Sequence, residues 1–148
     1  MPGLRQPLTI ASLVLTVVGF GLSAYLTYVH YNLDALVCSD GGCATVQTSE
    51  YSEMFGLPIA MFGMVMFAVL IAGTIIREVK PDFDDLISTG ILMLLISAVI
   101  YWAYLTWLEL NVIHAVCQWC VATSIATVLM LFVEAFRWYR GYKELGAA

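Results

Sequence analysis

Four apolar segments, each long enough to cross a membrane, are the feature that most restricts the fold of this chain. They run over residues 8–28, 58–76, 86–108 and 112–136 and take up most of the 148 residues. A spanning helix needs roughly 20 predominantly apolar residues. Charged residues make up only 11% of the chain, whereas soluble chains carry about a quarter. We therefore expect an all-α, integral-membrane four-helix bundle that forms a single domain.

The first apolar segment has the position of a signal peptide but not its pattern. The apolar region of a signal peptide usually spans about 7–15 residues and ends at an A-x-A-like site. Segment 8–28 is longer, and no such site follows it. We expect it to be retained as the first membrane helix.

The basic residues predict how the bundle is oriented. Short loops rich in Lys and Arg remain in the cytoplasm. All six basic residues fall on one side of the expected bundle: Arg5, Arg77, Lys80, Arg137, Arg140 and Lys143. We therefore expect cytoplasmic termini and a cytoplasmic turn at 77–85, with an outer loop at 30–57 and an outer turn at 109–116. This is the topology of a multi-pass protein of the plasma (inner) membrane.

The four cysteines form two close pairs, Cys38 with Cys43 in CSDGGC and Cys117 with Cys120 in CQWC. The expected topology places both pairs on the extracytoplasmic side, where disulfides persist. A Cys-x-x-Cys pair near the start of a helix gains a stabilised thiolate from the helix N-terminus. The Gly-Gly step of the loop pair permits a tight turn. Two such pairs beside a bilayer predict thiol–disulfide exchange coupled to a lipid-soluble compound.

Two other roles for the cysteines remain open from these residues. Four thiolates could hold a structural zinc ion tetrahedrally, although an oxidising compartment disfavours four free thiolates. Two inert disulfides are also possible, but closing such short loops stabilises a chain little. We favour redox exchange and expect no metal.

The absence of charge inside the expected spans argues against one further class of function. Ion pumps and many transporters carry ionisable side chains within the membrane. Here Glu134 lies near the inner boundary, and Glu109 and His114 lie near the outer one. An apolar interior suits a lipophilic ligand better than an ion.

The segment after the loop pair carries the most specific pattern in the chain. Ser49 follows Cys43 by six residues and precedes Tyr51-Ser52 and then FGLPIAMFG, which begins at Phe55. With a loop pair first and Cys-x-x-Cys opening the last helix, the chain resembles the vitamin K epoxide reductase family, specifically its bacterial homologues, over nearly its whole length. DsbB-type quinone reductases have a similar topology but the reverse order of pairs.

The resemblance implies a role for each of five residues. Cys120 would react with the bound quinone, and Cys117 would be its partner and accept electrons from the loop. Cys43 would attack the Cys117–Cys120 disulfide through a Cys43–Cys117 bridge, and Cys38 would exchange with an external dithiol protein. Ser49 would lie near these cysteines as a hydrogen-bonding residue.

The expected quinone site surrounds Cys120. Ser124, one helical turn beyond it, shares its face, and Phe55 belongs to the family-like motif. Trp119 is either a quinone neighbour or an interfacial anchor. Animal members carry a Tyr where this chain has Ser124, which leaves quinone hydrogen bonding and any action on an epoxide open. His114, three residues before Cys117, is either an interfacial residue or a group that stabilises the Cys117 thiolate or relays a proton.

These features predict a quinone-dependent thiol–disulfide oxidoreductase that supports disulfide formation. Its acceptor would be a quinone of the menaquinone, ubiquinone or vitamin K type. Because the sequence ends at Ala148, we expect a separate thioredoxin-like or DsbA-like dithiol partner rather than a fused domain, and no nucleic acid. The alternatives are a reductase of vitamin K or its epoxide, and a zinc- or disulfide-stabilised membrane assembly subunit.

Overall fold

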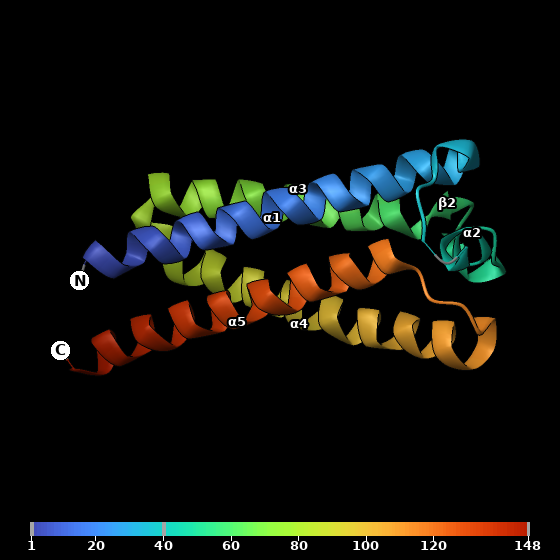
Figure 1. Ribbon diagram of the computed structural model, residues 1–148. Helices are drawn as coiled ribbons and strands as arrows, with labels where there is room; N and C mark the ends of the chain where they lie inside the picture. The colour runs from blue at the N-terminus through green and yellow to red at the C-terminus, as the bar shows by residue number, and fades with distance from the viewer. Residues whose placement is uncertain (1, 40, 148) are drawn as a thin grey trace.

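The computed structural model of the chain describes residues 2–39 and 41–147. Four long helices lie side by side (Figure 1): α1 (Pro2–Tyr31), α3 (Ile59–Val79), α4 (Asp84–Leu108) and α5 (Gln118–Ala147). The short 3-10 turn η3 (Pro81–Phe83) joins α3 to α4. Both ends of the chain lie at one end of the bundle, and the loop between α1 and α3 lies at the other. The predicted all-α four-helix fold is confirmed.

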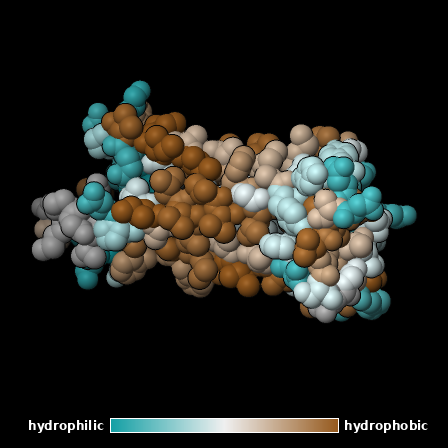
Figure 2. Space-filling model, turned by 45° about the horizontal axis from the view of Figure 1, so that its top comes forward, coloured by the Kyte–Doolittle hydropathy of each residue, from teal (hydrophilic) through white to brown (hydrophobic). Residues whose placement is uncertain are grey.

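The apolar residues of the bundle cover its outside as well as its core. Within each helix that is long and apolar enough to span a membrane, only 17–28% of the most apolar window is buried inside the protein. Figure 2 shows the result on one face, where a hydrophobic band separates hydrophilic ends. An apolar surface of this extent is suited to lipid rather than water. The helices therefore form a multi-pass membrane protein.

The core in the middle of the bundle joins α3, α4 and α5. It contains the buried side chains Phe67, Leu70, Ile91, Leu95 and Met130. Helix α1 packs against α3 with Gly19 at the contact, where an added Cβ would lie 2.3 Å from Cε1 of Phe67. A small residue at this point lets the two backbones approach closely.

Short elements cover the end of the bundle away from the termini. After α1 come the 3-10 turn η1 (Leu33–Ala35), helix α2 (Gly42–Gln47) and the 3-10 turn η2 (Glu50–Ser52). Strands β1 (Glu53–Met54) and β2 (Leu57–Pro58) then pair antiparallel, with Glu53 opposite Pro58 and Met54 opposite Leu57. Phe55 and Gly56 form the connecting turn, both with positive φ. This hairpin leads directly into α3.

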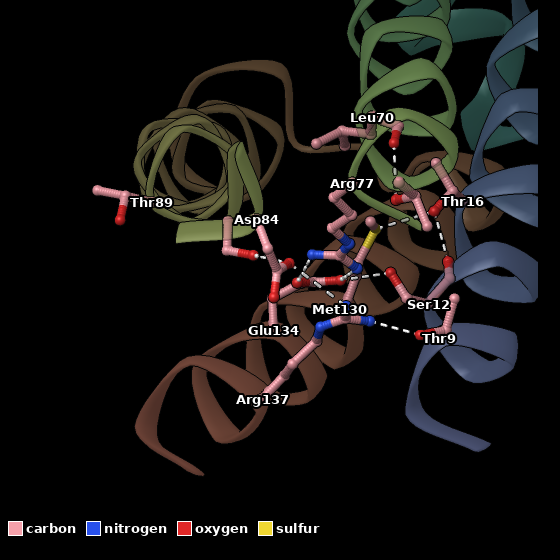
Figure 3. Close-up of polar contacts among 12 residues, drawn as sticks. Thr9, Ser12, Thr16, Leu70, Arg77, Asp84, Thr89, Met130, Glu134 and Arg137 are labelled. Atoms are coloured by element: carbon pink, nitrogen blue, oxygen red, sulfur yellow. Dashed lines mark hydrogen bonds and ion pairs between the residues drawn. The ribbon is translucent and has the colours of Figure 1, made fainter. Parts of the chain in front are cut away.

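Near the termini, the helices are joined by a buried polar cluster (Figure 3). Arg77 Nη1 and Nη2 on α3 donate to the two carboxylate oxygens of Glu134 on α5, at 2.6 and 2.7 Å. Ser12 on α1 also donates to Glu134. Arg137 donates to Thr9 of α1 and to Glu78 of α3. The sequence predicted Glu134 near the inner membrane boundary but did not predict its pairing with Arg77.

The fourth helix begins later than the predicted segment 112–136. Helix α4 continues into the π-helical turn η4 (Glu109–Ile113), and His114 then adopts the left-handed conformation with φ 53°. The backbone N–H of Ala115 donates to the Glu109 carbonyl at 3.1 Å. The chain therefore reverses through residues 114–117, and α5 starts at Gln118. The predicted start at residue 112 was wrong, because hydropathy does not distinguish an apolar turn from an apolar helix.

Candidate active site

The loop cysteines are bonded to each other. Cys38 and Cys43 form a disulfide with a Cα–Cα distance of 6.1 Å. Gly41 makes the turn between them in the left-handed conformation, with φ 70°, as the Gly-Gly step predicted. Cys38 is half-buried, whereas Cys43 is fully buried. Two of the four sulfurs are thus joined, so the tetrathiolate zinc site considered above does not form in this state.

The helix cysteines are free thiols at the start of α5. Cys117 directly precedes the helix, and its carbonyl accepts the N–H of Val121 at 3.0 Å. The backbone N–H of Cys120 donates to Sγ of Cys117 at 3.4 Å. The pKa of Cys117 is lowered, first by a hydrogen bond from the Cys120 side chain and then by the backbone N–H groups of Cys120 and Trp119, although burial opposes this. Cys117 is therefore the more readily ionised sulfur at this helix N-terminus.

All four cysteines belong to one cluster, with Cys43 and Cys117 in its buried part and Cys38 and Cys120 packed against it. Cys43 and Cys117 are both completely buried and share that part of the cluster with Leu26. Their neighbours Gly42 and Val116 are in backbone contact, because a Cβ added to Gly42 would lie 2.5 Å from the Val116 carbonyl oxygen. The fold thus brings the inner cysteine of the loop pair to the first cysteine of the helix pair.

Trp119 holds the segment that precedes the loop pair. Its indole N–H donates to the Val37 carbonyl at 2.7 Å, and its ring meets the ring of Tyr25 edge to face at 5.0 Å. The hydroxyl of Tyr25 accepts the N–H of Val37 at 3.0 Å. Two aromatic side chains therefore fix the residue next to Cys38.

A cavity of about 170 Å³ opens beside Cys120. Its lining comes from all four long helices and from the loop, and is mostly apolar. The lining residues are Ser23, Leu26, Val46, Gln47, Ser49, Tyr51, Ser52, Ile59, Ala60, Phe62, Gly63, Met66, Ala98, Tyr101, Trp102, Leu105, Leu108, Glu109, Ile113 and Cys120. An apolar cavity of roughly 150 Å³ is large enough for a benzene ring. The site can therefore hold the ring of a flat, lipophilic molecule against Cys120.

Two of the predicted site residues line this cavity together, Cys120 and Ser49. The Ser49 hydroxyl is half-buried and donates to the Val46 carbonyl at 2.7 Å. This bond fixes the serine at the end of α2. Its oxygen keeps the capacity to accept a hydrogen bond.

The other three predicted neighbours of the quinone lie elsewhere. Phe55 occupies the turn between β1 and β2 and is 93% exposed. Ser124 donates to the Val121 carbonyl at 2.8 Å and is not part of the cavity wall, and neither is Trp119. His114 is exposed, and its Nδ1 lies 3.1 Å from the Leu110 carbonyl oxygen.

Sequence reasoning missed the polar residues that α4 and η4 bring to the cavity. Tyr101 and Trp102 line it from α4, and Glu109 lines it from η4. Glu109 is only 5% exposed, and its Oε2 accepts the backbone N–H of Cys117 at 3.3 Å. The only signal in the sequence was an acidic residue in the apolar run TWLELNVI, which reads equally well as the solvated end of a helix.

The chain matches a known protein family over most of its length. The model of the vitamin K epoxide reductase family matches residues 10–135. The chain belongs to the vitamin K epoxide reductase family. Its predicted resemblance to that family is thus confirmed.

The chain is also similar to a distant relative whose name describes a redox activity. The thiol-disulfide oxidoreductase LTO1 of Arabidopsis thaliana is 26% identical over 121 residues, which cover 76% of this chain. The chain spans 32% of the length of that relative. Membership of the vitamin K epoxide reductase family and this relative together support a redox function in the membrane.

Proposed function

We propose that this protein is a quinone-dependent thiol–disulfide oxidoreductase. It would pass electrons from a soluble thioredoxin-like or DsbA-like dithiol protein through its two cysteine pairs to a quinone. The observation that carries the proposal is the arrangement of three sulfurs: Cys43 and Cys117 share one buried cluster, and Cys120 borders the apolar cavity.

The first step is exchange between the two pairs. The Cys43 thiolate attacks Sγ of Cys117 in the Cys117–Cys120 disulfide, and Cys120 leaves as a thiolate. Cys38 then attacks Cys43 in the mixed disulfide, which forms the Cys38–Cys43 bond and releases Cys117. Each step is an ordinary thiolate attack on a disulfide sulfur. The loop pair ends oxidised and the helix pair ends reduced, which is the state seen here.

The second step removes the electrons from the helix pair. The Cys117–Cys120 dithiol gives up two electrons and two protons and returns to the disulfide. A quinone held in the cavity supplies the two-electron acceptor and becomes quinol. The apolar walls would hold its ring beside Cys120, and Ser49 and Tyr101 would offer hydroxyls within the same cavity.

The third step restores the loop pair. Cys38, the less buried of the two, exchanges with the external dithiol protein. We assign this end of the bundle to the extracytoplasmic side, because the basic residues gather at the opposite end. The net reaction oxidises the carrier dithiol to a disulfide and reduces quinone to quinol, and so supplies disulfides outside the cytoplasm.

The test is quinol formation by purified protein in detergent, with dithiothreitol as reductant and menaquinone or ubiquinone analogues as acceptors. We expect the wild type to form quinol and the Cys120→Ser variant to lose that activity. Ser124→Ala serves as the control, because Ser124 is on the same helix outside the cavity. Turnover that survives in a folded Cys120→Ser variant would contradict the proposal.

A further inference from the structure

Glu109 is a buried carboxylate that the electron path described above does not use. It lies in the π-helical turn η4, between the end of α4 and the start of α5. Single turns of this kind occur frequently at functional sites. Burial of a carboxylate without an ion pair is costly, and in the described residues Glu109 has no cationic partner. A residue kept at this cost requires an explanation.

The carboxylate connects the cysteines to the cavity. Oε2 accepts the backbone N–H of Cys117, and the same side chain lines the cavity together with Cys120. Glu109 also opposes ionisation of Cys117, whose pKa is lowered chiefly by the hydrogen bond from the Cys120 side chain. Its other oxygen, Oε1, has no hydrogen-bond partner among residues 2–39 and 41–147. One oxygen is thus fixed and the other is available to exchange a proton.

The other groups around the cavity are poor proton carriers at neutral pH. The titratable side chains in its wall, besides Glu109 and Cys120, are Tyr101 of α4 and Tyr51 of η2. The phenol group of a tyrosine is a much weaker acid than a carboxylic acid. The described lining residues of α1, α2 and α3 carry no titratable group, and Glu109 is the single carboxyl among them all.

We propose that Glu109 relays protons from the Cys117–Cys120 dithiol to the oxygens of the quinone. The inference rests on the proposed function. The dithiol loses two electrons and two protons as its S–S bond forms, and these reduce the quinone to quinol. Glu109 carries each proton in turn: as a carboxylate it accepts one from a thiol, and as a carboxylic acid it donates that proton to a quinone oxygen. The carboxylate is regenerated each time, so atoms and charge balance.

The test compares the wild type with Glu109→Gln. Glutamine keeps the size of the side chain and an oxygen that can accept the Cys117 N–H, but it cannot carry a proton. We expect quinol formation to fall by about 100-fold or more, as is typical when a general acid or base is removed. Glu50→Gln is the matched control, since Glu50 is an exposed carboxylate in the loop between α1 and α3, at the same end of the bundle; its rate should equal that of the wild type.

A second readout needs no quinone. Because the charge of Glu109 disfavours the Cys117 thiolate, Glu109→Gln should shift the pH profile of Cys117 alkylation by iodoacetamide to lower pH. Exchange between the loop and helix pairs, followed by mass spectrometry without quinone, should be at least as fast as in the wild type, because a lower pKa makes Cys117 a better leaving group.

The outcomes separate the relay from a structural role and from the proposed function itself. Equal quinol formation by the wild type and Glu109→Gln would overturn the relay alone. A slow variant that also loses pair exchange, or whose alkylation profile does not move, would show a structural role and overturn it too. A wild type that forms no quinol would overturn both the relay and the proposed function.

Discussion

Individual residues decide how closely the two cysteine pairs approach. Gly42 has no side chain, so its backbone can lie against the Val116 carbonyl, and this contact sets Cys43 beside Cys117. Trp119 and Tyr25 hold Val37, the residue next to Cys38, by hydrogen bonds to its backbone. The site therefore depends on small and aromatic side chains as well as on the sulfurs.

Substitution of Gly42 by Ala should slow exchange between the pairs. The added Cβ would lie 2.5 Å from the Val116 carbonyl oxygen, so the loop must shift away from the turn that precedes α5. A displacement of about 1 Å can cost roughly 100-fold in rate, and we expect a loss of that order in stopped-flow thiol exchange. Gly21→Ala is the control, because no atom lies within 4 Å of its added Cβ. Equal rates in the two variants would contradict this role of Gly42.

The reactivity of Cys117 should depend on Cys120. The Cys120 side chain is the largest cause of the lowered pKa of Cys117. In Cys120→Ala that hydrogen bond is lost, so the pKa of Cys117 should rise and its thiolate fraction at neutral pH should fall. The pH at half-maximal alkylation of Cys117 should therefore move upward from its wild-type value, as measured by iodoacetamide labelling and mass spectrometry. No shift, or a downward one, would show that other groups stabilise the thiolate.

At the scale of helices, the ends and pairings of the elements were harder to predict than their existence. The length and apolar composition of the segments are enough to indicate four membrane helices, because few other structures can accommodate apolar segments of this length. Hydropathy did not reveal that the chain reverses direction after His114, because the residues of that turn are apolar as well. The Arg77–Glu134 pair joins residues 57 positions apart, and a contact between two helices is not encoded in the pattern of either one.

The site was only partly predictable, because it too depends on contacts between elements that are far apart in the sequence. Both cysteine pairs, and Ser49 beside Cys120, could be singled out from spacing and from a family-like motif. The motif did not reveal that Phe55 sits in an exposed turn, because the direction of a side chain depends on local φ and ψ. Glu109 was overlooked since its burial arises only when η4 folds against α2 and against the turn that precedes α5.

Loss of Arg77 should destabilise the bundle. Its guanidinium is fully buried against Glu134, and removing one partner of such a pair leaves an uncompensated charge at a cost of about 3–5 kcal/mol. We expect Arg77→Leu to lower the free energy of unfolding by this amount in a reversible detergent unfolding assay. Lys143→Leu, which changes an exposed charge near the same end, should have little effect. Recovery of the free energy of unfolding in the double variant Arg77→Leu/Glu134→Leu would confirm that the unpaired carboxylate causes the loss. An unchanged free energy of unfolding in Arg77→Leu would contradict the importance of the pair.

At the scale of the whole molecule, the two ends of the bundle differ in chemistry. Arg77 and Arg137 lie in the polar cluster near the termini, and both cysteine pairs lie at the opposite end (Figures 1 and 3). The hydrophobic band of Figure 2 lies between hydrophilic ends. Because basic residues favour the cytoplasmic side, we propose that the cysteines face outward.

Sidedness can be tested by labelling intact cells with a membrane-impermeant maleimide. In a background with all four native cysteines changed to serine, Glu50→Cys in the outer loop should be labelled directly. Lys80→Cys, between α3 and α4, should be labelled only after the membrane is permeabilised. The reverse pattern would place the cysteine pairs in the cytoplasm and contradict the proposed direction of electron flow.

The most direct measurement of electron passage between the pairs is a disulfide trap. In the double variant Cys38→Ser/Cys120→Ser, Cys43 and Cys117 keep no other partner. We expect them to form a Cys43–Cys117 disulfide after mild oxidation, identified by mass spectrometry of peptides from non-reduced protein. The matched variant Cys43→Ser/Cys117→Ser should form no bridge between Cys38 and Cys120. Absence of the Cys43–Cys117 bridge in folded protein, or equal bridging in the matched variant, would contradict a relay through these two sulfurs.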